Sequence, residues 1–137
     1  MSKITTKKLH CGITVVMEKI DYVQSAAFGV WVKAGAVDET ADQAGISHFI
    51  EHMMFKGTTK RGFEKLNDDL ESLGGEYNAY TDYSITVYSI SCLEEELGNA
   101  IELLGDMVTN SVFLKEEIEK ERGVILAEMK ASMDSVE

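Results

Sequence analysis

The sequence predicts an α+β fold, in which helices cover a mostly antiparallel or mixed sheet and the elements follow the order ββααββαα. Two observations support this prediction. The spacing of apolar residues changes along the chain from a period of two to a helical period, and then repeats this change. The expected strands come in consecutive pairs with helices grouped between them, which is typical of α+β rather than doubly wound folds. No glycine-rich phosphate loop follows any expected strand.

Two strands are expected first, over residues 13–20 and 24–34, because both segments contain many β-branched and aromatic residues. Asp21 and Tyr22 lie between them and are candidates for a hairpin turn. Residues 35–42 are prone to turns, and glycine must serve many turns because the chain has no proline. The sequence therefore predicts that these first two strands pair as a hairpin.

Two helices are expected next. Residues 45–56 place apolar residues at helical spacing, and Gly57 stands where a residue that ends a helix is expected. We expect this helix to be well buried. Residues 62–73 carry one apolar stripe opposite an acidic, solvated face, and Gly74 and Gly75 follow as an expected left-handed stop.

The period of two returns over residues 77–81 and 83–91, which predicts a second pair of strands. Two final helices are expected over residues 93–109 and from residue 115 to the end of the chain, each with an apolar stripe. Because the sequence contains no repeat, low-complexity tract or linker, residues 1–137 are interpreted as a single domain.

The composition excludes several classes of function. The 137 residues have a formal net charge of −11, which argues against binding to nucleic acid or to a membrane surface because both depend on basic side chains. Cationic partners fit this charge better. No stretch reaches the roughly 18 consecutive apolar residues that a membrane span needs, and no apolar signal segment follows the N-terminal lysines. We therefore expect a cytoplasmic location.

The two cysteines, Cys11 and Cys92, lack the CxxC spacing of a zinc site. They are expected to be free thiols in a reducing compartment, since two cysteines do not form a disulfide framework in a chain of this size. A chain of this length also buries enough surface to form a core without a metal. A bound metal would therefore serve function rather than stability.

The most informative segment is HFIEH, residues 48–52, which lies inside the first expected helix. Residues at i and i+4 project from one face of a helix, so His48 and His52 suit two neighbouring positions of a tetrahedral Zn²⁺ site. Glu51 lies on the same side, where a carboxylate can accept a proton from a water that the metal acidifies. This order of residues is the inverzincin motif. The alternative, an ordinary helix, is disfavoured because the chain has only three histidines and this helix is otherwise apolar.

A catalytic zinc ion also needs a third protein ligand. The remaining histidine, His10, has no partner pattern and is expected to be exposed and inert. In the last expected helix, Glu121 and Glu128 are seven positions apart and share a face. Apolar residues flank Glu128, so we expect it near the core boundary with a polar partner. Spacing alone therefore nominates Glu128 first and Glu121 second, and a solvated face explains the other acidic residues.

Segments along nearly the whole chain resemble the pitrilysin-like (M16) zinc peptidases, and most closely the mitochondrial-processing-peptidase-like branch. Residues 45–58 match the active-site helix of that family, and residues 121–129 match its distal segment. Residues 11–15, 28–35 and 73–81 resemble its first two strands and the strand that follows the helices. The resemblance implies part of the LuxS/MPP-like metallohydrolase fold.

The resemblance also implies roles for individual residues. His48 and His52 would bind one zinc ion, Glu51 would be the general base, and Glu128 would be the third ligand. His52 and Glu128 are 76 positions apart (128 − 52), which is similar to the usual gap in the family. Glu121 would support the site from behind the ligands, as outer carboxylates do when they orient ligating imidazoles.

The implied function is that of a zinc-dependent metalloendopeptidase that hydrolyses peptides or small unfolded proteins. Asn78 and Ala79 match the strand on which family members bind the substrate, where an extended peptide can add to an exposed edge. The acidic charge would attract basic peptides, although a solvated acidic surface with no meaning for the substrate explains it equally well.

Family members are several times longer than this chain and consist of two related halves. We therefore expect residues 1–137 to be the N-terminal part of a larger peptidase, and to be weakly active or inactive alone. Water exclusion and substrate closure would need the missing C-terminal half or a partner subunit. Surfaces that would face this half are expected to promote self-association. The alternative is a non-catalytic structural or interaction subunit of the same fold, which the HxxEH motif and Glu128 disfavour.

Overall fold

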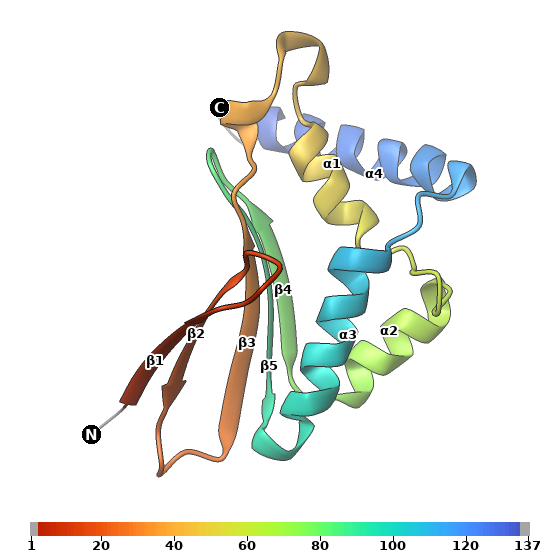
Figure 1. Cartoon of the computed structure of the whole chain (residues 1–137). Helices are drawn as coiled ribbons and strands as arrows, with labels where there is room; N and C mark the ends of the chain where they lie inside the picture. The colour runs from red at the N-terminus through yellow and green to blue at the C-terminus, as the bar shows by residue number, and fades with distance from the viewer. Residues whose placement is uncertain (1–2, 135–137) are drawn as a thin grey trace.

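A computed structural model describes residues 3–134 of the chain. The predicted fold class is confirmed, because antiparallel strands lie on one side of the molecule and helices cover them on the other (Figure 1). In the described part of the chain, no helix is long and apolar enough to cross a membrane. The expected continuation of the last helix over residues 135–137 lies outside the described residues.

The main sheet contains three antiparallel strands in the order β3-β5-β4, where β3 is Ser25–Val32, β4 is Glu76–Thr81 and β5 is Thr86–Leu93. The central strand β5 turns alternate side chains toward the helices, and Tyr88, Ile90 and Cys92 are buried there. This alternation is the period of two that predicted the strand. The order of the strands leaves β4 at one edge of the sheet.

The N-terminal strands form a separate two-stranded sheet, in which β1 (Lys3–Lys8) pairs with β2 (Thr14–Lys19). The hairpin predicted around Asp21 and Tyr22 is therefore wrong, since β2 pairs with a strand that precedes it. The sequence did not predict β1 because three of its six residues are lysines and all six are exposed. An exposed ribbon needs no apolar alternation, so its sequence carries little strand pattern.

The helices are α1 (Ile46–Met53), α2 (Phe63–Ser72), α3 (Leu97–Asn110) and α4 (Lys115–Asp134). Gly74, with a φ of +65°, follows α2 as predicted. By contrast, α1 ends four residues before Gly57, and Gly57 redirects the chain with a φ of +127°. The expected deep burial of α1 is wrong, because only Met53 in this helix is fully buried. It packs between β4 and α4 at one end of the sheet (Figure 1).

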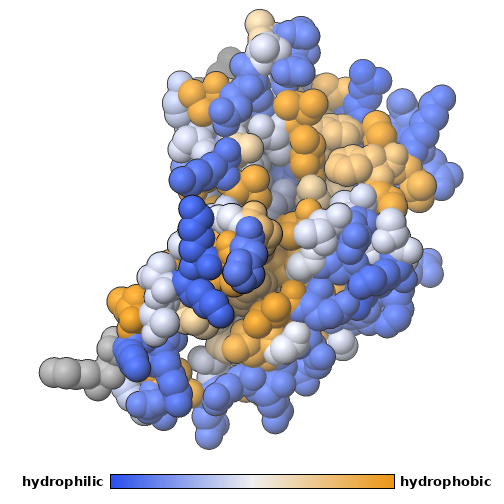
Figure 2. Space-filling model, viewed as in Figure 1, coloured by the Kyte–Doolittle hydropathy of each residue, from blue (hydrophilic) through white to orange (hydrophobic). Residues whose placement is uncertain are grey.

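The core lies where α2 and α3 cover β5, and both helices turn apolar side chains toward it. The buried residues of this cluster are Leu66, Leu70, Leu73, Tyr88, Ile90, Cys92, Ala100, Leu103, Leu104 and Met107. Cys92 and the exposed Cys11 are both free, as predicted. Other apolar side chains stay at the surface, and Figure 2 shows hydrophobic groups around α1 and α4. Exposed residues there include Phe113, Leu114, Val124, Leu126 and Met129.

A charged cluster fixes the segment between α1 and α2 against α2 and α3. The guanidinium group of Arg61 donates hydrogen bonds to Asp69 (2.9 Å), Glu102 (2.6 Å) and Asp106 (2.5 Å). Thr58 donates a further hydrogen bond of 2.7 Å to Asp106, whose side chain is 1% exposed. Burial opposes ionisation, but the hydrogen bonds that Asp106 accepts hold its pKa below the usual value. We call these five residues the Arg61 cluster.

Candidate metal centre

Helix α1 begins at a backbone position that glycine favours, since Gly45 has a φ of +89°. The carboxylate of Glu39, from the preceding loop, accepts hydrogen bonds from the backbone N–H groups of Gly45 (2.7 Å) and Ser47 (2.8 Å). These bonds satisfy N–H groups that have no partner within the helix, and they hold the pKa of Glu39 below its usual value. The start of α1, and with it the position of His48, is thereby fixed.

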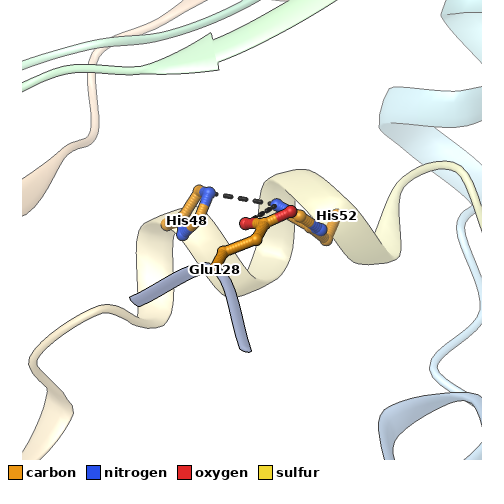
Figure 3. A group of neighbouring side chains, drawn as sticks. All are labelled: His48, His52 and Glu128. Carbon is orange, nitrogen blue, oxygen red and sulfur yellow. Dashed lines mark hydrogen bonds and ion pairs between the residues drawn. The ribbon is translucent and has the colours of Figure 1, made fainter. Parts of the chain in front are cut away.

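The two histidines of α1 project from the same side of the helix, one turn apart, and a carboxylate from α4 faces them (Figure 3). His48 Nε2 lies 3.0 Å from His52 Nε2, and His52 Nε2 lies 3.7 Å from Glu128 Oε2. One donor atom from each residue lies within 4.8 Å of the other two. The structure therefore brings together the three residues that the sequence nominated as ligands, which we call the metal centre.

The chemistry of this donor set fits zinc. Two imidazole nitrogens and one carboxylate form one of the usual ligand sets of catalytic zinc, which leaves a fourth position open. In a tetrahedral site with Zn–N bonds of 2.0–2.1 Å, two ligating nitrogens would be about 3.3 Å apart. The separation of 3.0 Å between the two Nε2 atoms is close to this value. Only a small adjustment of the rings would be needed to hold the ion.

The environment of Glu128 differs from the sequence prediction. Its side chain is 51% exposed, so the expected position near the core boundary is wrong. Two of its apolar neighbours, Leu126 and Met129, are also more than half exposed. An apolar neighbourhood in the sequence therefore did not indicate burial, because this end of α4 packs on the rest of the described chain along one face only.

Of the two carboxylates of α4 that contact His52, the buried one is Glu121, which is 4% exposed. Its Oε1 lies 2.7 Å from His52 Nδ1, and its Oε2 lies 2.6 Å from Lys56 Nζ. Burial opposes ionisation, but hydrogen bonds from Lys56 and His52 hold the pKa of Glu121 below its usual value. An ionised carboxylate can only accept, so His52 Nδ1 carries the proton. The lone pair of His52 Nε2 is then available to a metal.

The remaining motif residue, Glu51, contacts the edge strand of the sheet. Thr81, the last residue of β4, donates a hydrogen bond of 2.5 Å to Glu51 Oε2. Burial, together with the nearby charge of Glu51, raises the pKa of Tyr88 to about 12. Asn78 and Ala79 lie on β4, where Asn78 is exposed and Ala79 packs against the core. The structure thus joins the end of this strand to the motif helix.

Two residues near the metal centre are absent from the expected site. Lys56 lies in the first expected helix, and its spacing of four from His52, which puts both on one side of a helical turn, is the signal that could assign it a role. Thr81 lies on an expected strand, and no sequence pattern indicates its contact with Glu51. His10 is exposed, as predicted.

Comparison with known proteins agrees with this architecture. Residues 14–137 match the family described as Insulinase (Peptidase family M16). The chain belongs to peptidase family M16. This membership confirms the resemblance found in the sequence.

Among M16 relatives, an uncharacterized zinc protease of Rickettsia felis is 41% identical over 128 residues, which cover 93% of this chain and 31% of that protein. The beta subunit of the mitochondrial-processing peptidase of Neurospora crassa is 40% identical over 126 residues, 92% of this chain and 26% of that protein. The crystal structure of a protease from Helicobacter pylori superposes with a TM-score of 0.88 at 27% identity, covering 93% of this chain and 31% of that one. The chain therefore spans about a third or less of the length of these relatives.

Proposed function

We propose that this M16 chain carries the zinc site and general base of a metalloendopeptidase that cleaves peptides or small unfolded proteins. The convergence of His48, His52 and Glu128 is the observation that carries this proposal. The name of the Rickettsia felis relative, an uncharacterized zinc protease, and that of the Neurospora crassa relative, a processing peptidase subunit, support it. A bound zinc ion would polarise the scissile carbonyl and acidify a water. A non-catalytic subunit of the same fold would have no use for this donor set.

The chain's own residues have distinct tasks in this proposal. His48 and His52 would hold the ion through Nε2, with Glu128 as the third ligand. Glu121 fixes the orientation of the His52 ring through Nδ1. Glu51 would be the base, and since Thr81 occupies its Oε2, the proton from water would be accepted by Oε1. The same carboxyl group would then donate this proton to the leaving amine.

The substrate would bind in extended form along the edge strand β4. Main-chain hydrogen bonds to an edge strand require little of the peptide sequence, so Asn78 and Ala79 would contact the substrate mainly through their backbone. The net charge of −11 favours basic peptides. Cytoplasmic location stays a prediction.

In the whole protein, this chain would be the N-terminal part of a larger peptidase with two related halves. The proposal is supported by the length of the relatives and by the exposed apolar side chains around α1 and α4 (Figure 2). A C-terminal half or a partner subunit would cover such surfaces, and the isolated chain would be weakly active and would self-associate through them.

Two measurements test the proposal. Elemental analysis of the purified chain at neutral pH should find one zinc ion per chain, with weaker binding in His48→Ala and Glu128→Gln. In the full-length protein, Glu51→Gln should lower kcat by about 10²- to 10⁴-fold while zinc is retained. A wild-type chain that binds no zinc would overturn the site. Full peptide cleavage by the Glu51→Gln protein would show that Glu51 is not the general base.

A further inference from the structure

Lys56 lies just after α1 and contacts the carboxylate that stands behind the metal centre. We propose that Lys56 is a positioning residue for the zinc ligand His52, and that it acts through Glu121. This inference rests on the proposed zinc site but goes beyond it, because Lys56 is itself neither a ligand nor a base. The contacts of Glu121, the fixation of Lys56 and the sign of its charge carry the proposal.

The carboxylate of Glu121 is held at both of its oxygens. Oε1 lies 2.7 Å from His52 Nδ1, and Oε2 lies 2.6 Å from Lys56 Nζ. A carboxylate with one partner can rotate about its terminal bond, whereas two partners on opposite oxygens fix its plane. The side chains of His52, Lys56 and Glu121 are 18%, 19% and 5% exposed, so water competes little for either contact. Charge-assisted hydrogen bonds are strong and well aligned in such surroundings.

Lys56 is itself fixed, so it can act as an anchor. Its Nζ lies 5.3 Å from the centroid of the Phe63 ring, within the range of a cation–π interaction. Its backbone N–H donates a hydrogen bond of 3.1 Å to Met53 O, which continues the last turn of α1. The next residue is Gly57, whose backbone turns the chain away. A series of fixed contacts therefore runs from Lys56 through Glu121 to the imidazole ring of His52.

Because Lys56 is positively charged, the direction in which its replacement changes the zinc affinity tests the proposal. A lysine near a divalent cation repels it, so loss of this charge alone would strengthen zinc binding. Loss of the anchor would weaken zinc binding, because Glu121 would hold the His52 ring less firmly. A lysine that served only to dock α4 onto α1 would change stability and leave the zinc affinity of the folded chain unchanged.

The experiment measures the zinc dissociation constant of this chain at neutral pH, by competition with a chromophoric chelator. Lys56→Met should raise the Kd about tenfold, at the lower end of the effects seen for outer partners of metal ligands. Lys56→Arg should restore most of the affinity, since a guanidinium group also donates to a carboxylate. Lys120→Met, an exposed lysine of α4 that pairs with Glu117, is the matched control and should bind zinc like the wild type.

A double variant tests whether the effect passes through Glu121. If it does, adding Lys56→Met to Glu121→Gln should change the Kd little beyond Glu121→Gln alone, and a full further tenfold loss would overturn the proposal. A Lys56→Met chain that binds zinc as tightly as the wild type, or more tightly, would also overturn it and leave the zinc site standing. A wild-type chain that binds no zinc would contradict both the role of Lys56 and the proposed zinc site. Lys56→Gln replaces Lys56→Met if the latter does not fold, with the same expected sign.

Discussion

The Arg61 cluster is built on the segment that follows α1 and the metal centre on α1 itself, and their polar atoms are paired differently. In the Arg61 cluster, one guanidinium group meets the carboxylates of Asp69, Glu102 and Asp106, so donors and acceptors match within the chain. In the metal centre, two imidazole nitrogens and a carboxylate oxygen converge within 4.8 Å of one another. All three atoms can offer lone pairs.

This difference distinguishes charges that stabilise the fold from side chains that would hold the proposed metal ion. A buried charge is tolerated when the chain supplies its partner, as Arg61 and Thr58 do for Asp106. Converging lone pairs repel unless a cation joins them. The Arg61 cluster is therefore complete as folded, whereas the metal centre would be completed by the zinc ion proposed above. Four predictions test this contrast.

The largest expected effect is on stability, from Arg61→Met. This change removes the guanidinium group that Asp69 and Asp106 share, and removing one partner of a buried pair costs about 3–5 kcal/mol. We expect about 3 kcal/mol from urea unfolding without zinc, at the lower end of that range because Arg61 is 17% exposed. Lys65→Met, an exposed lysine that pairs with Asp69, is the control and should change little. Equal losses in both variants would contradict the structural role of the cluster.

Zinc removal should have the next largest effect. A ligand that binds only the folded state at 100 times its Kd stabilises that state by about 2.7 kcal/mol. The free energy of unfolding with zinc should therefore exceed that with a chelator by about this amount, as measured by chemical denaturation. The difference should shrink in Glu128→Gln and persist in Lys65→Met. An unfolding curve that does not change with zinc would mean that the three donors do not bind the ion.

Acid should weaken the Arg61 cluster. The pKa of Asp106 is lower in the folded chain than its usual value of 3.8, so its ionised form stabilises the fold fully above the unfolded pKa. This contribution is lost as the pH falls through the lower, folded pKa. Urea unfolding from about pH 5 to pH 2 should show a smaller loss in Asp106→Asn than in the wild type. Asp68→Asn, at an exposed position on α2, should follow the wild type.

The smallest effect is expected from Glu128→Gln without zinc. The side chain is half exposed, so its replacement should change the free energy of unfolding by no more than about 0.5 kcal/mol. Glu121→Gln should cost more, because Glu121 is buried and bonded at both oxygens. Thermal unfolding in the presence of a chelator compares the two. A larger loss of stability in Glu128→Gln would mean that Glu128 stabilises the fold, and would contradict its proposed role as a metal ligand.

The spacing of residues in the sequence predicted those features that depend on the geometry of a single helix. Helical spacing located α1, and the i, i+4 spacing of His48 and His52 placed both rings on one side of it. The spacing of seven likewise placed Glu121 and Glu128 on one face of α4, and both contact His52 in the structure. In each case the relation holds within a single helix.

The sequence could not predict relations between distant segments. The flanking apolar residues suggested burial for Glu128, but the buried carboxylate is Glu121, because packing against α1 and not the sequence neighbourhood decides exposure. The partner of β2 is not predictable either, although β1 is its neighbour in the sequence, because β1 is exposed and carries no apolar alternation. Arg61 and Asp106, 45 positions apart, carry no mutual pattern at all.

The contact between His52 and Glu121 has a consequence for the order of events during synthesis. These residues are separated by 69 positions, so at about 5–20 residues per second the ribosome adds Glu121 roughly 3–14 s after His52. During that interval, the two histidines have neither the carboxylate that contacts His52 Nδ1 nor the facing carboxylate of Glu128. The complete donor set of the proposed zinc site therefore exists only once α4 has been synthesised as far as Glu128.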